Sequence, residues 1–196
     1  RLKNQVGRYS GFAMYVPEKQ LPNGKASISL AQPIFNQLNT ILTVSSLPQE
    51  SVGIIEEQDL IAIGTKASLD AASILIEYGY IYEAPLRDLE LWEMFSKELA
   101  YQTYVGLKKA LGGNSVYVSE TSLAPYVWKR PLELGITQDK DVLALQIALA
   151  QEKVYPPPGK DCPISGSFFD CTRTAVILFQ IKYGLELTGK IDESTR

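Results

Sequence analysis

The chain has 196 residues, 19 basic and 22 acidic side chains, and a formal net charge of −3 at pH 7. This mild acidity argues against nucleic acid as the main partner, because phosphate binding needs a basic patch and none stands out. The sequence holds no histidine, which removes the commonest general base and the commonest metal ligand. No apolar run approaches the roughly 20 residues needed to span a bilayer.

Residues 1–10 are polar and hold no apolar core of a signal peptide. They lead directly into an apolar segment that, as a strand, needs neighbours to bury both of its faces. We therefore expect further sequence upstream, with room for a leader.

The first predicted elements are a strand and a helix. Residues 11–16 are apolar and end at Pro17, which predicts a strand. Ser27 or Ser29 can cap the helix that follows a Pro-Asn-Gly turn. Its predicted apolar face consists of Leu30, Ile34, Leu38 and Ile41.

Two further apolar runs predict strands at residues 59–63 and 73–76, with Glu77 at the end of the second. Both runs are continuously apolar, which is typical of a sheet covered on both faces. Pro85 opens a long helix that stops at Gly112. Its predicted apolar face consists of Leu89, Trp92, Leu99 and Ala110.

Alternation of strands and helices indicates an α/β domain over residues 1–111. Its few strands and helices suggest the later half of a larger sheet. Residues 112–126 are small and polar, so they predict a linker, although Val116 and Val118 could form a short strand.

The last segment, residues 127–196, predicts a small all-α module. Asp139 or Asp141 can cap its first helix, whose apolar residues are Val142, Leu145 and Leu149. After a break at residues 156–159, Asp170 can cap a second helix that ends at Gly184. The second helix carries Ala175, Val176, Phe179 and Tyr183, and Asp192 can start a third.

Cys162 and Cys171 are the two cysteines of the chain, with Pro163 and Gly166 between them. This closeness suggests a local disulfide across a turn, which the chain-entropy treatment values at roughly 2.5–3 kcal/mol. Such a bond would place the protein outside the cytosol. The alternative is two free, half-buried thiols.

The module contains two similar helices in which an apolar residue precedes glutamine, at Leu145-Gln146 and Phe179-Gln180. The wider pattern includes Leu134-Gly135, Asp141-Val142, Gly166, Phe169-Asp170, Thr172, Ala175-Val176, Gly184-Leu185, Thr188-Gly189, Asp192 and Thr195-Arg196. In order and spacing it resembles the three-helix peptidoglycan-binding domain of wall hydrolases. The resemblance implies peptidoglycan as the partner and an extracellular or periplasmic location at the cell wall.

Most residues of this pattern are expected to be structural, as core, caps and turns. Tyr155, Phe168 and Lys160 are possible ligand contacts, and each is equally consistent with ordinary surface. An alternative is a domain that keeps this fold and has lost ligand binding.

Glu77 is the candidate catalytic carboxylate of the first domain, among aliphatic and aromatic neighbours in Ala-Ser-Ile-Leu-Ile-Glu-Tyr-Gly-Tyr at residues 72–80. In open α/β sheets, sites form beyond the carboxyl ends of strands. On these grounds alone, a solvated boundary residue is the commoner reading. The run, with residues 52–54 and 59–64 and the helix through residues 98–107, resembles the later half of a zinc-dependent N-acetylmuramoyl-L-alanine amidase (amidase type 3). The resemblance implies a catalytic role for Glu77.

The resemblance has departures. The family binds zinc through two histidines and one glutamate that precede the region matched, so zinc is expected for the intact enzyme but cannot be bound by this chain's own residues. Val52 replaces a common arginine, Ala72 replaces the proline of the strand motif, and the asparagine that usually follows the Gly-Phe turn is absent.

Two functions follow from these patterns. The first is a cell-wall hydrolase fragment that cleaves the amide between N-acetylmuramic acid and L-alanine, inactive without the other half of its amidase domain. The second is a non-catalytic anchoring protein that keeps the amidase-like half as a scaffold. The upstream sequence favours the enzyme if it holds the histidine motifs of the family.

Overall fold

A computed structural model describes residues 7–64, 69–112 and 126–196 of the chain. The chain divides into two compact units, and the division passes through a long helix. The first unit takes in Arg1–Tyr82 and Leu99–Glu120, and the second takes in Glu83–Glu98 and Thr121–Arg196. The predicted linker lies outside the described residues except for Gly112 and Tyr126.

The first unit contains a three-stranded sheet in the order β2-β1-β3. The strands are β1 (Ala13–Val16), β2 (Ile54–Glu56) and β3 (Leu75–Glu77). β1 runs parallel to β2 and antiparallel to β3, so that Met14 pairs with Ile54 on one side and Ile76 on the other. The first predicted strand is therefore confirmed, and the parallel pair is joined through a helix, as an α/β unit requires.

The strand predicted at residues 59–63 is wrong. This segment forms a turn, in which Gly64 N donates to Leu60 O at 2.6 Å, and Ile61 is 75% exposed. The strand lies earlier, at β2, because Gly53 O accepts from Met14 N at 2.8 Å and aligns the residues after Gly53 with β1. Local apolarity did not reveal this register, since pairing is decided by the neighbouring strand.

The predicted burial on both faces is found at the central strand β1 but not at the two outer strands. β1 is almost wholly buried, whereas the residues of β2 and β3 are half-buried or exposed. β1 lies between two partners, while each outer strand has one partner among the described residues. β3 also begins two residues later than predicted and includes Glu77.

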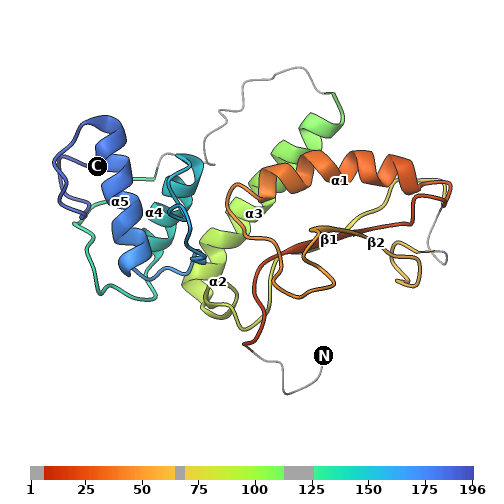
Figure 1. Ribbon diagram of the computed structural model, residues 1–196, viewed down its shortest axis with the longest axis horizontal. Coiled ribbons are helices and arrows are strands. Elements are labelled where there is room, and N and C mark those ends of the chain that lie inside the picture. Colours follow the sequence, from red (N-terminus) through yellow and green to blue (C-terminus); the bar gives the residue numbers. More distant parts are fainter. Residues whose placement is uncertain (1–6, 65–68, 113–125) are drawn as a thin grey trace. The chain divides into compact units, whose positions relative to one another are not determined.

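Helix α1 (Gly24–Leu38) packs on β1 and β2 (Figure 1). It begins before either predicted capping serine, with Asn23 at its N-cap position. Ser27 is buried inside the helix, and its hydroxyl donates to Asn23 O at 2.8 Å. Ile34 and Leu38 are buried as predicted, together with Ala31.

The long predicted helix is two helices, α2 (Ala84–Arg87) and α3 (Leu89–Ala110). Asp88 separates them because its backbone is extended and its side chain accepts from Glu90 N and Leu91 N. The predicted apolar face is wrong at its first two residues, since Leu89 is 84% and Trp92 45% exposed, whereas Leu99 is buried and Ala110 is half-buried. The buried residues follow a different helical series: Leu91, Phe95, Leu99, Gln102 and Gly106.

Gly106 shows why the later part of this series, from Leu99 onward, is buried in the first unit. A Cβ atom there would lie 2.4 Å from the Ile34 Cα atom, so α3 approaches α1 at backbone distance. Gln102 adds a polar contact, because its side-chain oxygen accepts from the Gln37 amide.

The second unit is built around α4 (Lys140–Gln151) and α5 (Asp170–Tyr183), which pack against each other (Figure 1). Of the two candidate caps of α4, Asp139 is the N-cap, and its carboxylate accepts from Asp141 N and Val142 N. Asp170 is the first residue of α5 rather than its cap. Gly184 ends α5 with a φ of 65°, as predicted.

Two features of the second unit differ from the prediction. Tyr183, expected on the buried face of α5, is 52% exposed, whereas the polar residues Thr172 and Gln180 of this helix are buried. Residues 192–196 form a turn headed by Asp192 rather than a helix. The Asp192 carboxylate accepts from Ser194 N and Thr195 N at 3.1 Å, which is the bonding of a cap.

Candidate functional site

The two glutamines of the repeated helix motif hold the second unit together in the same way. Gln146 is 1% exposed and Gln180 is fully buried. The Gln146 oxygen accepts from Gly166 N at 2.9 Å, and the Gln180 oxygen accepts from Gly189 N at 3.0 Å. Each amide oxygen therefore fixes a glycine in the loop after its own helix.

The amide nitrogens repeat the pattern. Gln146 donates to Ser167 O and to the Thr172 hydroxyl at 3.0 and 2.9 Å. Gln180 donates to Lys190 O and to the Thr195 hydroxyl, both at 3.1 Å. In both networks the carbonyl belongs to the residue that follows the glycine, and the threonine lies six residues after the glycine. The repeat in the sequence is thus a repeat of a buried hydrogen-bond network.

The predicted disulfide between Cys162 and Cys171 is confirmed, and it joins two cysteines nine positions apart in the sequence. It joins the loop before α5 to the first turn of that helix. The same loop is held by Tyr155, whose hydroxyl donates to Pro163 O at 2.8 Å. Burial raises the pKa of Tyr155 to about 12.

Of the three proposed ligand contacts, the structure leaves one on the surface. Tyr155 is 6% exposed and Phe168 is fully buried, so both belong to the core of the second unit. Lys160 is exposed. The sequence did not show whether these loop aromatic residues are exposed or buried, because their burial depends on how the loop folds back onto α4.

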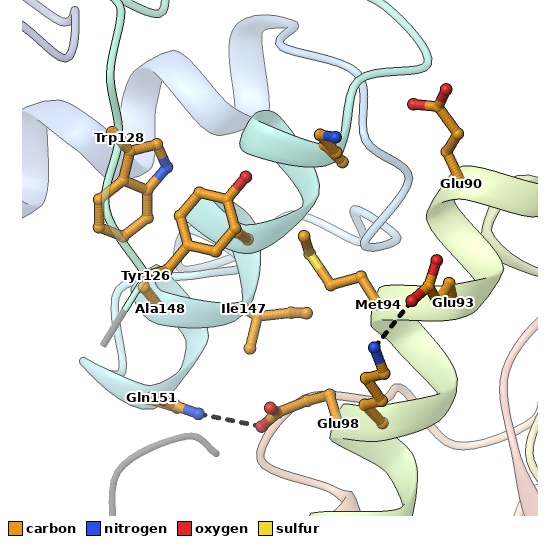
Figure 2. A pocket seen from close by; sticks show the side chains of 12 residues that line it. Glu90, Glu93, Met94, Glu98, Tyr126, Trp128, Ile147, Ala148 and Gln151 are labelled. Carbon is orange, nitrogen blue, oxygen red and sulfur yellow. Dashed lines mark hydrogen bonds and ion pairs between the residues drawn. The ribbon is translucent and has the colours of Figure 1, made fainter. Parts of the chain in front are cut away.

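A cavity of about 480 Å³ opens within the second unit (Figure 2). It lies between residues Glu90–Glu98 of α3 and the face of α4 that carries Ala144, Ile147 and Gln151. Met94 and Ile147 extend into it from the two helices. Tyr126 and Trp128, from the segment before α4, line it as well. This site was not predicted from the sequence; its sequence signal is the aromatic pair Tyr126 and Trp128, where the predicted linker meets the module.

Asp141 holds the two aromatic rings in place. Its carboxylate accepts from the Tyr126 hydroxyl and its backbone oxygen accepts from the Trp128 indole N–H at 3.0 Å. The ring centroids lie 5.2 Å apart. Burial and the bond to Asp141 raise the pKa of Tyr126, so its hydroxyl keeps the proton that it donates. Arg130 adds an ion pair of 3.0 Å to the same carboxylate.

Charged and polar groups surround this cavity. Glu98 is 6% exposed, and Gln151 donates to its carboxylate at 3.1 Å (Figure 2). At the exposed side, Lys97 pairs with Glu93 at 2.8 Å, and this pair holds the pKa of Glu93 below its usual range. The cavity therefore combines aromatic and aliphatic surfaces with carboxylate acceptors.

Glu77 is half-buried at the end of β3 in the first unit. It pairs with Ala13, the first residue of β1, because β3 runs antiparallel to β1. Glu77 therefore lies at the edge where β1 begins, and not at the edge where β1 and β2 end. The placement rule for parallel sheets does not apply to it, and the catalytic role predicted for Glu77 rests on the sequence resemblance alone.

Zinc does not fit the residues at Glu77. Among residues 7–64, 69–112 and 126–196, no group of three or more histidine, cysteine, aspartate or glutamate side chains is placed to hold a metal ion. Histidine is absent from the whole sequence, and both cysteines are joined in the disulfide.

The first unit also contains a buried carboxylate, Glu50, which was not predicted from the sequence. It is 5% exposed and accepts from the hydroxyls of Tyr15 at 2.8 Å, Ser45 at 2.6 Å and Tyr80 at 3.0 Å. These residues come from β1 and from the segments after α1 and β3. The cluster ties together the segments that flank the sheet.

Comparison with known proteins gives a family match for part of the second unit. Residues 138–196 match the family described as "Putative peptidoglycan binding domain". No curated protein matches the chain. The match covers both glutamine-centred networks and the disulfide, and it supports association with the cell wall, as the resemblance implied. The amidase resemblance of residues 1–111 has no such support. None of the described helices is long and apolar enough to cross a membrane.

Proposed function

We propose that the protein binds peptidoglycan through residues 127–196 and works at the cell wall, in the extracellular or periplasmic space. The family match over residues 138–196 is the observation that carries this proposal. The networks of Gln146 and Gln180 support it, because they give the matched residues the ordered loops that a binding domain needs. The disulfide is consistent with a location outside the cytosol.

Sedimentation with insoluble peptidoglycan tests this function. The full 196-residue chain should pellet with purified cell-wall sacculi in a saturable way and stay in the supernatant with cellulose. Retention in the supernatant in both cases would refute binding, provided that circular dichroism shows the protein to be folded.

We propose, as a second function, that the first domain contributes Glu77 to hydrolysis of the amide between N-acetylmuramic acid and L-alanine. The resemblance around residues 72–80 supports this. A carboxylate in this position could accept a proton from an attacking water. Because zinc does not fit the residues of this chain, metal ligands would have to come from outside the sequence given, including the other half of an amidase domain.

Dye release from labelled peptidoglycan with added zinc separates this enzyme from a wall-anchoring protein. The chain alone should release no dye above buffer. A protein extended by the upstream coding sequence should release dye, and Glu77→Ala should abolish release while sedimentation stays unchanged. Equal release by wild type and Glu77→Ala would remove the role of Glu77, and no release by either would leave the anchoring function.

A further inference from the structure

We propose that the cavity lined by Tyr126, Trp128, Met94 and Ile147 binds an N-acetylated sugar of the glycan strand. This inference rests on the proposed peptidoglycan binding and names the part of the polymer that is recognised. All of the lining residues belong to the second unit.

The cavity is open to solvent, and its size suits a small-molecule ligand. A volume of about 480 Å³ lies within the range of small-molecule sites, which is roughly 300–1,000 Å³. One sugar unit with its substituent is of a size that such a space accommodates.

The aromatic side suits the ring of a sugar. A pyranose presents C–H groups on its faces, and these pack against the flat apolar surface of an aromatic side chain. The Tyr126 hydroxyl and the Trp128 N–H both donate hydrogen bonds to Asp141. Their polar groups are therefore already satisfied, and the rings can contact the sugar through their apolar faces. Because the two rings are fixed before binding, less conformational entropy is lost when a ligand packs on them.

The remaining walls suit an N-acetyl group and ring hydroxyls. Met94, Ala144 and Ile147 form aliphatic surface, which a methyl group can contact without losing hydrogen bonds. Glu98 and the Gln151 amide lie at one end of the space and can accept from or donate to ring substituents (Figure 2).

The charges favour the glycan over the stem peptide. Three carboxylates line the cavity, Glu90, Glu93 and Glu98, against Lys97 and Lys140. Lys97 is already paired with Glu93. A stem peptide carries carboxylates of its own, which these glutamates would repel, whereas sugar hydroxyls are neutral donors to a carboxylate.

Titration calorimetry with a tetramer of β-1,4-linked N-acetylglucosamine tests the proposal on the full chain. The wild type should bind the tetramer and should not bind a synthetic stem peptide. Ala148→Arg, which fills the cavity from α4 without removing a hydrogen bond, should weaken binding at least tenfold. Leu187→Arg adds the same charge at a residue that is 56% exposed and does not line the cavity, so binding should not change.

A second variant keeps the test valid if Ala148→Arg does not fold. Tyr126→Leu retains apolar bulk, removes the ring and should also weaken binding at least tenfold. Its aromatic control is Phe169→Ala, at an exposed residue outside the cavity. Thermal melting of each variant checks that the module is folded.

The outcomes distinguish this inference from the proposed function. No binding of the tetramer by the wild type, unchanged binding by the folded cavity variants, or binding of the stem peptide in place of the sugar would overturn the glycan site. If sacculi still pellet the wild type in those cases, peptidoglycan binding stands and its site lies elsewhere. If sacculi do not pellet the wild type, the proposed function itself fails.

Discussion

Buried polar residues hold both units through several bonds each. Glu50 accepts from three hydroxyls, and Gln146 and Gln180 each bond to at least three loop groups. A buried polar group costs free energy unless it is hydrogen-bonded, so each of these residues also constrains the partners around it. Their effect on stability should therefore exceed that of exposed ion pairs such as Lys97–Glu93.

Glu50→Ala tests this at the sheet. The substitution leaves the hydroxyls of Tyr15, Ser45 and Tyr80 without their common acceptor, which should lower the free energy of unfolding by about 2–4 kcal/mol. Glu50→Gln keeps an acceptor oxygen and should cost less. Urea denaturation measures both, and an alanine variant as stable as wild type would show that the cluster contributes nothing.

Because of Tyr155, the free energy of unfolding of the second unit should fall as the pH becomes alkaline. Its pKa is raised by burial from 10 to about 12, so the folded state keeps the proton that the unfolded state loses. The stabilisation is complete below pH 10 and is lost as the pH rises through about 12, a change of about 3 kcal/mol. Melting curves between pH 9 and 12 should fall less steeply for Tyr155→Phe than for wild type. Parallel curves would contradict this role.

At the scale of elements, each glutamine network fixes the loop that follows its helix against that helix through hydrogen bonds. Gln180→Leu has nearly the same volume but leaves Gly189 N and Lys190 O without their amide partner. We expect a loss of about 2–4 kcal/mol, and a similar loss for Gln146→Leu. Gln32→Leu, at an exposed residue of α1, should change stability by less than about 0.5 kcal/mol. Chemical denaturation would show equal losses at all three positions if the networks were unimportant.

The positions of the elements were predictable to different degrees. α4 and α5 carry their own start and stop signals in Asp139 and Gly184, and both were located from the sequence. β2 and the buried face of α3 were misplaced, because Gly53 and Gly106 act through contacts with Met14 and Ile34, far away in the chain. Such contacts are invisible to a local pattern.

At the scale of the whole molecule, the disulfide should stabilise the second unit selectively. A disulfide between residues nine positions apart constrains the unfolded chain and is worth about 2.5 kcal/mol. Replacing both Cys162 and Cys171 by serine should lower the melting temperature and weaken sedimentation with sacculi near that temperature. Hydrogen exchange should show faster opening in α5 and unchanged protection in β1. Slower or equal exchange in α5 would rule out this contribution.

Some residues of the candidate sites could be predicted from the sequence, and others were found only in the structure. Cys162–Cys171 and the repeated glutamines could be read from the sequence, since their partners lie within one local unit. Tyr155 and Phe168 were considered as surface and are core. The cavity could not be predicted, because its lining residues Met94, Tyr126 and Ile147 come from segments that are far apart in the sequence.

By itself, the sequence determined the wall-binding module, its disulfide and the absence of histidine ligands for zinc, because spacing and composition carry these features. The tertiary structure alone decided which strands pair, which face of α3 is buried and where an aromatic cavity opens. These depend on close approach between segments distant in the chain, where a glycine, a strand register or a buried amide selects one arrangement among those that local propensity allows.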